Sequence, residues 1–455
     1  MTEHTEHRLL STEAVEALLS TPSQVPQETP EEIASYFDRL WPILRSITGA
    51  GVRQTLDILA EILPLERIEV ASGTEVYDWT VPKEWVVREA YIVAPDGQRL
   101  LDVAEHTLHL VNYSIPFHGR ISRKELDAHL YSLPDQPDAI PYVTSYYSPR
   151  WGFCLTQRQR DALPDGDYEV FVDTELVDGS LTIGEHVLPG ESDQEVLIST
   201  NTCHPSLANN ELSGPLVAAF LARRLAAWPY RRLTYRFVFL PETIGSISYL
   251  HLRGDHLKAK MVAGYQVTCV GLDHAFVYER SRRGDSDADR AALLALHQSY
   301  GDGFEIRSFR PNWGSDDRQY CSPGFNLPLG SIMRSSYDEY PEYHTSLDNR
   351  DLVSFPAIVE AIDLYELVMR SLDANGVYRN TRPHGEVQLG KLGLYPPMGN
   401  YQENLDQVAA MLWLLNLADG NSDLIAISER SGVDIRLLDH FAGVLKELGI
   451  LDIVG

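Results

Sequence analysis

The sequence predicts an α/β fold: a mostly parallel sheet with helices on both faces, an inserted small β domain and a C-terminal winged-helix-like domain. Three observations support this fold class. Strand-like and helix-like segments alternate from Glu195 onward, which is typical of a parallel sheet covered by helices. Residues 74–188 contain short alternating runs rich in Tyr, Val and Thr, which indicate a separate β unit. After about residue 400, three helix-period segments follow one another with the spacing of a helix-turn-helix unit.

Composition divides the chain into four parts. We expect a lead-in over residues 1–29, an α/β domain built from residues 30–73 and 189–385, an inserted β domain over residues 74–188, and a winged-helix-like domain over residues 386–455. The α/β domain should open with a helix, because Thr29, Pro30 and the two acids after them form a typical helix start. Helical spacing continues to about Ile47, and a second helix is expected over residues 54–63.

Strands and helices then alternate in the second part of the α/β domain. The expected strands cover residues 195–200, 233–240 and 261–270, and the expected helices follow Gly214, run through Leu252 and span about 355–372. Such alternation places the carboxyl ends of the parallel strands at one edge of the sheet. Open α/β sheets bind their ligands at that edge.

The composition restricts the partners and the location of the chain. Its formal net charge of −27 disfavours nucleic acid and anionic membranes, because both attract clustered Lys and Arg. No apolar run of about 18 residues and no signal-peptide pattern is seen. The four cysteines lack CxxC spacing, as is typical of reduced thiols. We therefore expect a cytoplasmic protein that binds neither nucleic acid nor a membrane.

The expected third helix of the C-terminal unit is poorly suited to DNA. Residues 434–448 carry acids beside their bases, with Asp439 and Glu447 against Arg436 and Lys446. Nucleic-acid readers instead present a basic surface to the phosphates. Docking or dimerisation is the better expectation, so the C-terminal and inserted domains are the candidates for contacts in a homo-oligomer.

Three polar loops follow expected strands or helices, and they should meet at one edge of the sheet. They contribute His204, Glu242 and His344. Two histidines and a carboxylate are the minimum set for a zinc site that keeps a position open for water. A fourth candidate, Asp316, lies in the polar loop 314–320.

Each of these residues also has a purely structural interpretation. His204 would cap its strand, and Glu242 would interact with a helix dipole. His344 would pack beneath neighbouring tyrosines, and Asp316 would form an Asx turn paired with Arg318. Spacing along the sequence leaves both interpretations open.

Several motifs occur in an order that points to a known family. In chain order they are His204, ANNELSG at 208–214, PETIG at 241–245, SDD at 315–317 and HTSLD at 344–348. This set resembles the zinc aminopeptidases of the leucyl aminopeptidase and glutaminyl cyclase type. From about residue 30 to the end, the chain is similar to an aminopeptidase-like family found among polysaccharide and natural-product biosynthesis proteins. Members of that family share the inserted β domain and the C-terminal winged helix.

Three positions depart from the pattern of the dizinc enzymes. Asn209 stands where those enzymes place the bridging aspartate, Thr243 replaces the second of two adjacent glutamates, and residues 268–271 replace a third acid. An amide cannot supply the negative charge that two zinc ions about 3.5 Å apart require. The resemblance therefore implies a site for one zinc ion, with a site that holds no ion as the alternative.

The resemblance implies a metal-dependent hydrolase that cleaves an amide bond of a small peptide or amino-acid conjugate. One zinc ion would be bound by His204, Asp316 and His344, and Glu242 would act as the catalytic base. The substrate would be oriented by three polar residues, Asn209, Asn210 and Arg318. Two alternatives stay open: a non-catalytic homologue that binds a small molecule or peptide, and an acyl-transfer or cyclising enzyme such as the glutaminyl cyclases.

The inserted domain contains an unusually aromatic stretch, Tyr142 to Phe153. We expect it to cover part of the mouth of the pocket, since aromatic side chains commonly line ligand sites. An aromatic core inside the small β domain is the alternative.

Overall fold

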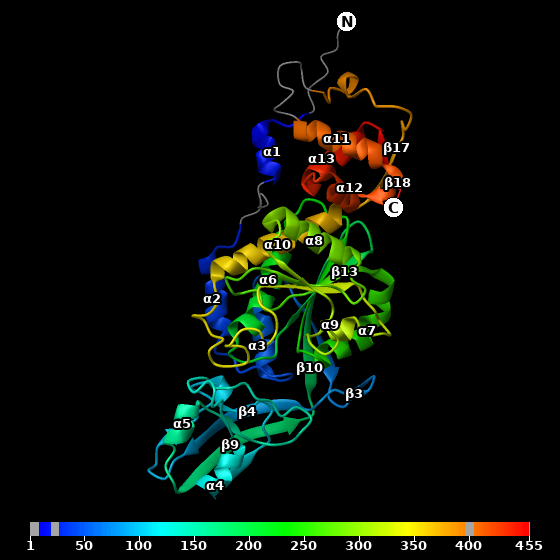
Figure 1. Cartoon of the computed structure of the whole chain (residues 1–455). Coiled ribbons are helices and arrows are strands. Elements are labelled where there is room, and N and C mark those ends of the chain that lie inside the picture. The colour runs from blue at the N-terminus through cyan, green and yellow to red at the C-terminus, as the bar shows by residue number, and fades with distance from the viewer. Residues whose placement is uncertain (1–8, 20–26, 396–404, 455) are drawn as a thin grey trace.

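The computed structural model describes residues 9–19, 27–395 and 405–454. Figure 1 shows the winged-helix part at the top, the α/β part in the middle and the inserted β part at the bottom. Much of the expected lead-in, residues 1–8 and 20–26, lies outside the described residues, and between them Thr12–Leu19 forms helix α1.

The central sheet has eight strands and is mostly parallel. Its order is β1 (Glu66–Ala71), β10 (Ser180–Leu188), β12 (Thr234–Leu240), β11 (Glu195–Asn201), β13 (Met261–Gln266), β16 (Leu329–Met333), β14 (Val277–Glu279) and β15 (Glu305–Arg307). The four middle strands, from β12 to β16, pair in parallel, whereas β1, β10 and β14 add antiparallel pairs toward the edges. The α/β fold with a mostly parallel sheet is thereby confirmed.

Helices cover both faces of this sheet. One face carries α2 (Pro30–Leu40), α3 (Ala50–Leu59), α6 (Ser213–Ala226), α8 (Asp287–Tyr300) and α10 (Phe355–Ala374), and the other carries α7 (Ile244–Lys260) and α9 (Asp317–Tyr320). Alternate side chains of a strand point to opposite faces. Val196 and Ile198 of β11 accordingly join one hydrophobic core, while Leu197 between them joins the other.

The first helix of the α/β domain begins as expected and ends early. Thr29 accepts a hydrogen bond from the Glu32 amide at 3.1 Å, and Pro30 occupies the first helical position. The helix ends at Leu40 rather than near Ile47. Pro42 explains the early end, because a proline has no N–H to continue the helical hydrogen bonds and its ring clashes with the carbonyl four residues earlier.

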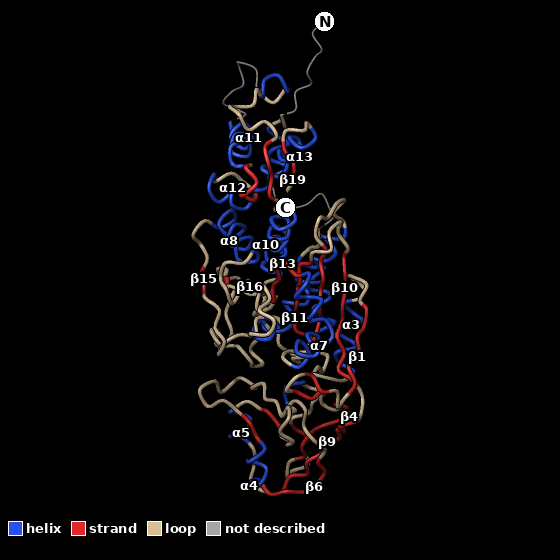
Figure 2. Tube along the Cα trace, turned by 90° about the vertical axis from the view of Figure 1, so that its right-hand side faces the viewer, coloured by secondary structure: helices blue, strands red, loops and turns tan. Residues whose placement is uncertain are grey.

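The inserted part has its own four-stranded antiparallel sheet (Figure 2). Its four strands have the order β5 (Arg99–Leu100), β4 (Glu84–Val93), β9 (Asp167–Val177) and β6 (Phe117–Ser122). The short pairs are β2 (Glu75–Val76) with β3 (Trp79–Thr80) and β7 (Leu130–Tyr131) with β8 (Phe153–Cys154), and the short helices are α4 (Arg123–Leu126), α5 (Gln157–Ala162), η1 (Thr107–His109) and η2 (Asp127–His129).

One expected boundary of the inserted domain differs from the structure. Residues 180–188, which the range 74–188 assigned to the insertion, form β10 of the central sheet, between β1 and β12. β10 follows β9 across a turn of only two residues, so the alternating pattern runs without a break from one sheet into the other. The chain thus leaves the insertion directly into the α/β domain.

The C-terminal part combines a small sheet with a helix-turn-helix. Strands β17 (Val377–Asn380), β18 (Asp419–Asp423) and β19 (Leu451–Ile453) form the sheet, and the helices are η4 (Leu389–Leu392), α11 (Leu405–Leu417), α12 (Leu424–Ser431) and α13 (Ile435–Glu447). Because β17 pairs with β18 and β19, this unit begins before the expected boundary at residue 386. Helix α13 packs against α10 and α1.

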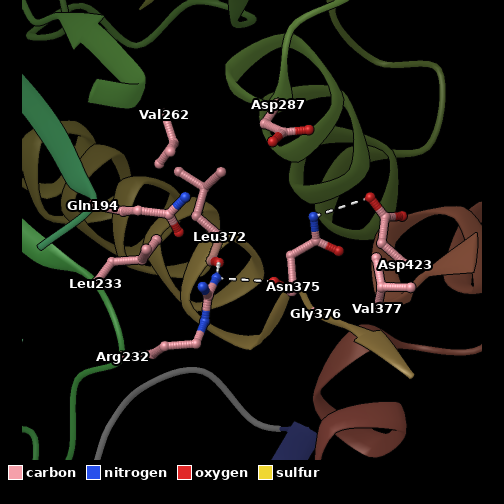
Figure 3. A pocket seen from close by; sticks show the side chains of 10 residues that line it. All are labelled: Gln194, Arg232, Leu233, Val262, Asp287, Leu372, Asn375, Gly376, Val377 and Asp423. Atoms are coloured by element: carbon pink, nitrogen blue, oxygen red, sulfur yellow. Dashed lines mark hydrogen bonds between the residues drawn. The ribbon is translucent and has the colours of Figure 1, made fainter. Parts of the chain in front are cut away.

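A cavity of about 190 Å³ lies between the α/β and winged-helix parts (Figure 3). Gln194, Leu233 and Val262 contribute from the amino ends of β11, β12 and β13, Asn375 contributes from the end of α10, and Asp423 contributes from the winged-helix side. The side-chain amide of Asn375 donates a hydrogen bond to Asp423 at 3.1 Å (Figure 3). The cavity is therefore at the opposite end of the parallel strands from the loops that carry the expected site. Among the described residues, no helix has the length and apolar character needed to cross a membrane.

Candidate active site

The loops after the central strands bring three of the expected residues together. His204 follows β11, Glu242 follows β12, and His344 lies in a loop beyond β16. The imidazole rings of His204 and His344 have centroids 5.4 Å apart. The Nε2 atom of His204 lies 3.5 Å from a carboxylate oxygen of Glu242. The sheet edge therefore gathers the three side chains as the sequence predicted.

A residue that the sequence did not single out, Glu211, orients His204. One Glu211 oxygen accepts a hydrogen bond from the His204 Nδ1 at 2.6 Å, and the other accepts from the His204 backbone amide at 2.8 Å. Glu211 belongs to a π-helical turn, Ala208–Leu212, and such turns are frequent at functional sites. Because Nδ1 is occupied, His204 presents Nε2 to the site.

The surroundings of His204 are buried and charged. Arg45 is fully buried and donates from Nε to the His204 carbonyl at 2.8 Å. Burial alone would lower the pKa of His204, but Cys203 and Glu211 beside it raise that pKa well above its usual value. The buried guanidinium of Arg45 also interacts electrostatically with Glu211.

His344 has the opposite character. Its ring stacks on Tyr343 at a centroid distance of 4.0 Å, and its Nε2 is buried without a hydrogen-bond partner. Burial and the neighbouring His204 lower the pKa of His344 to about 3, so its ring is neutral near pH 7. A neutral imidazole with a free nitrogen is a metal ligand or a hydrogen-bonding group for a substrate.

Two carboxylates, those of Glu242 and Asp316, are neighbours in the site. One oxygen of Glu242 accepts a hydrogen bond from the Ser315 hydroxyl at 2.7 Å. Asp316 accepts from the Thr243 amide at 2.7 Å and from the Ser246 hydroxyl at 2.8 Å, while its second oxygen is buried without a partner. Burial, and then the charge of Glu242, raise the pKa of Asp316 to about 8. Asp316 is therefore a buried neighbour of Glu242 whose bonded oxygen is used by Thr243 and Ser246, whereas the structural interpretation paired this acid with Arg318.

The residues expected to orient a substrate differ in how much of their side chain is free. The Asn209 side chain is fully buried, and it donates to the Ser335 hydroxyl at 3.1 Å and accepts from the Gly271 amide at 2.8 Å. Both ends of its amide are thus used inside the protein. Asn210 keeps a buried, unpartnered carbonyl oxygen, which a substrate could engage. Arg318 donates from Nε to the Ser315 carbonyl at 3.2 Å and is only partly buried.

Asp348, a second residue that sequence reasoning missed, holds the turn that contains Asn209 and Asn210. Its carboxylate accepts hydrogen bonds from the backbone amides of Asn209 at 2.7 Å and Asn210 at 3.0 Å, and from the Tyr340 hydroxyl at 3.0 Å. It is fully buried, and this burial raises its pKa to about 6 against the opposing effect of those hydrogen bonds. The HTSLD motif therefore links the His344 loop to the π-helical turn.

Several residues in these loops have a strained backbone. Four non-glycine residues with positive φ lie in the loops of the candidate site: Ser206 (44°), Thr243 (63°), Cys269 (52°) and His344 (54°). Such conformations cost roughly 1–3 kcal/mol each and are found preferentially at active sites. Thr243 is the clearest case, because a β-branched residue disfavours this region most.

Two histidines and Asp316 carry the donor atoms that bear on metal binding. His204 has Nδ1 held by a carboxylate, as metal-binding histidines usually do. His344 and Asp316 each have a buried donor atom without a partner. The ring separation of 5.4 Å is close to the value of about 5 Å for two imidazoles on one tetrahedral zinc, given Zn–N distances near 2.0–2.1 Å. Asn209, at the bridging position, has no free atom for a second ion.

Among the described residues, the potential metal ligands that lie closest together are not the two histidines and Asp316. Ligand atoms of Cys203, His204 and Glu211 lie within 4.8 Å of one another. These atoms already bond to each other or to the backbone: Nδ1 of His204 bonds Glu211, and the Cys203 sulfur accepts from the Glu242 amide at 3.2 Å. We therefore assign this group to orienting His204. Holding an ion at Nε2 requires an acidic ligand to move closer to the two histidines.

Comparison with known proteins shows the family to which the chain belongs. A family model described as "Domain of unknown function (DUF4910)" matches residues 35–375, and one described as a winged helix-turn-helix matches residues 376–453. A Clostridium acetobutylicum protein named "Putative polysaccharide biosynthesis protein with aminopeptidase-like domain" is 42% identical over 431 residues, which cover 95% of this chain and 98% of that protein.

Two solved structures show the same fold. The crystal structure of a "putative peptidase" from Clostridium acetobutylicum has 41% identity and a TM-score of 0.86, covering 93% of this chain and 96% of that one. A zinc aminopeptidase from Bacillus subtilis has 14% identity and a TM-score of 0.55, covering 77% of this chain and 96% of that one. The chain therefore belongs to the DUF4910 family, with an aminopeptidase-like α/β fold and a C-terminal winged helix.

Proposed function

We propose that this protein hydrolyses an amide bond in a small peptide or amino-acid conjugate with the help of one zinc-class metal ion. The observation that carries the proposal is the pair of neighbouring histidines, His204 and His344, with Glu242 beside His204. His204 is held by Glu211 so that Nε2 points toward Glu242, and His344 offers an unpartnered Nε2 in the neighbouring ring. The aminopeptidase-like fold supports the same class of reaction.

His204 and His344 would hold the ion, and Asp316 is the acidic ligand that we propose. When bound, such an ion lowers the pKa of a coordinated water and polarises the substrate carbonyl. The unpartnered oxygen of Asp316 and its position beside Glu242 support this role.

Glu242 is proposed as the general base. One of its oxygens is fixed by Ser315 and the other lies toward His204, so the carboxylate is held at the edge of the site. Its side chain is 28% exposed, whereas the surrounding acids are buried, so a water can reach it. Glu242 would accept the proton of the attacking water and deliver it to the leaving amine.

Three polar groups remain to orient the substrate. The free carbonyl oxygen of Asn210 would accept a hydrogen bond from a substrate N–H group, and Arg318 would bind a carboxylate. Asn209 would contribute indirectly, because its occupied amide fixes the turn that carries Asn210.

The test is Glu242→Gln, assayed for hydrolysis of a panel of aminoacyl amides and dipeptides. Glutamine keeps the size of the side chain but cannot take up a proton, so turnover should fall by roughly 10²–10⁴-fold. The matched control is Glu75→Gln at an exposed glutamate, which should leave turnover unchanged. Full activity in Glu242→Gln would show that Glu242 is not the base. Simultaneous loss of activity and metal would make Glu242 a ligand instead.

The same assay separates the alternatives. A wild-type protein that binds members of the panel without turning them over would be a binding homologue. Formation of a cyclised or transferred product in place of free acid and amine would identify an acyl-transfer enzyme.

A further inference from the structure

The inserted β domain reaches directly into the candidate site. Its segment 140–146 lies along the His344 loop, although the two are some 200 residues apart in the sequence. The Tyr142 amide donates to the His344 carbonyl at 2.8 Å, and the Ser346 amide donates to the Ile140 carbonyl at 2.9 Å. Pro141 and Thr345 form a β-bridge between these bonds. The loop that carries His344 is thus paired with the insertion on its backbone.

The side chain of Tyr142 also contacts the side chains of both histidines. Its ring is edge-on to His204 at a centroid distance of 4.9 Å and to His344 at 5.4 Å. Because the two histidine rings are themselves 5.4 Å apart, the three rings form a nearly equilateral triangle. Edge-to-face pairs at this spacing are attractive and restrict the orientation of each ring.

A chain of hydrogen bonds anchors the Tyr142 hydroxyl. Tyr146 donates to the side-chain oxygen of Asn112 at 3.1 Å, and the Tyr142 and Tyr146 hydroxyl oxygens are 2.9 Å apart. A tyrosine has one proton to donate, and Tyr146 gives it to Asn112, whose oxygen can only accept. The proton between the two tyrosines therefore belongs to Tyr142.

Further hydrogen bonds connect Asn112 to His204 through Arg45, in the N-terminal part of the α/β domain. The Asn112 side-chain amide donates to the Arg45 carbonyl at 2.9 Å, and this bond fixes which end of that amide is the acceptor. Arg45 in turn donates from its guanidinium to the His204 carbonyl at 2.8 Å. The His204 ring contacts Tyr142 of the insertion, and the His204 carbonyl accepts from Arg45. Tyr146 and Asn112 link these two contacts through hydrogen bonds.

We infer that Tyr142 is a positioning residue which the inserted domain contributes to the site, and that the Tyr146–Asn112 chain holds its ring against His204 and His344. The inserted domain is then a structural part of the active site and not an appendage. The Tyr142 hydroxyl donates its only proton to Tyr146, so this proton is already used within the protein. Tyr142 therefore acts through the fixed position of its ring. This inference deepens the proposed function, since it concerns the same two histidines.

The test follows the accessibility of the histidines with diethyl pyrocarbonate, which modifies accessible neutral imidazoles, and reads the modified peptides by mass spectrometry. It requires neither turnover nor bound metal, so it decides the role of Tyr142 even if the protein is no hydrolase. Tyr142→Ala should raise the modification rate of His344 by at least about tenfold, because it removes two aromatic contacts. Tyr146→Phe keeps the Tyr142 ring and removes one hydrogen bond, so a rise of about threefold to tenfold is expected.

The control is Tyr147→Ala, directly after segment 140–146. The ring of Tyr147 is exposed and takes no part in the Tyr142–Tyr146–Asn112 hydrogen bonds, so the modification rates of this variant should match those of the wild-type protein. The exposed His118 reports on the reagent and should react equally in every variant. Unchanged modification of His344 in a folded Tyr142→Ala protein would overturn the inference. Wild-type rates in Tyr146→Phe would overturn the anchoring role of the hydroxyl chain. If Tyr142→Ala fails to fold, Tyr146→Phe alone still decides that role.

Discussion

At the scale of single residues, the site depends on how two chemically identical side chains are made different. His204 is bonded to an anionic carboxylate, whereas His344 is surrounded by rings and has a free nitrogen. Burial and mutual repulsion keep His344 neutral, while Glu211 and Cys203 favour a charged His204. An ion at Nε2 would replace the proton of His204, and Glu211 would then keep the ring in the orientation that ligation needs.

Glu211→Gln tests this orienting role. Glutamine leaves the Nδ1–H of His204 without a charged acceptor, so the affinity for zinc should fall by about 10- to 100-fold, as for other partners of metal-bound histidines. Competition with a chelator measures the affinity, and Glu75→Gln is the control. An unchanged affinity would mean that Glu211 serves only the local fold.

The sequence identified the histidines but missed Glu211 and Asp348 for a physical reason. Glu211 lies inside the ANNELSG motif, and only the π-helical turn brings it back onto a histidine seven residues earlier. Asp348 ends the HTSLD motif, yet its partners are backbone amides 138 and 139 residues away. Spacing along a chain contains no information about such tertiary bonds. A carboxylate close to each loop histidine was the available signal.

At the scale of elements, propensity and capping predicted the long helices, while tertiary pairing decided the strand boundaries. The start of α2 followed from Thr29 and Pro30, and α10 spans nearly the expected residues. Helix α8 was not expected, although Ser286 and Asp289 form a capping box at its start. The assignment of β10 to the central sheet depends on its partners β1 and β12, which a local pattern does not identify.

The short η1 helix of the inserted domain predicts a dependence of stability on pH. The His106 side chain caps η1 by accepting the Leu108 amide at 3.1 Å, and burial with the nearby His109 lowers its pKa from 6.5 to about 4. The unfolded chain therefore binds this proton more readily than the native protein. The stabilisation is complete above pH 6.5 and is lost as the pH falls toward 4. Between pH 7.5 and 5 the loss should be about 2 kcal/mol.

His106→Asn removes the titrating group and keeps a cap that can accept the same amide. The free energy of unfolding in urea should accordingly depend less on pH in this variant. Between pH 7.5 and 5, its decrease should be smaller than the decrease in the wild-type protein by about 2 kcal/mol. His118→Asn, at an exposed histidine of the same domain, should keep the wild-type pH dependence. If His106→Asn and the wild-type protein showed the same pH dependence, titration of His106 would be ruled out as its cause.

At the scale of the whole molecule, the two added parts lie at opposite ends of the parallel strands. The insertion contacts the carboxyl ends, where the candidate site is, and the winged-helix part closes the amino ends around the cavity of Figure 3. Helix α13, the third helix of the winged-helix part, packs on α10 and α1. We therefore propose that this unit is a docking element and that the protein, with its charge of −27, does not bind DNA.

An ion pair between Arg290 and Asp423 joins the α/β part to the winged-helix part. Arg290 of α8 forms two hydrogen bonds of 2.6 Å with Asp423, the residue that caps α12. Arg290→Gln should weaken the docking by about 2 kcal/mol, in the range for hydrogen bonds to charged groups. Limited proteolysis near residues 381–386 should accelerate, while Arg283→Gln at an exposed arginine should not change it. Equal cleavage rates would show that apolar packing alone holds the domain.

The number of metal ions per chain tests the central claim most directly. Protein purified in the presence of zinc and then dialysed should contain close to one ion per chain by elemental analysis. His344→Gln should reduce this content strongly, and His118→Asn should leave it unchanged. Two ions per chain would contradict the single-metal site that Asn209 implies, and a content near zero in the wild-type protein would contradict the metal-dependent mechanism altogether.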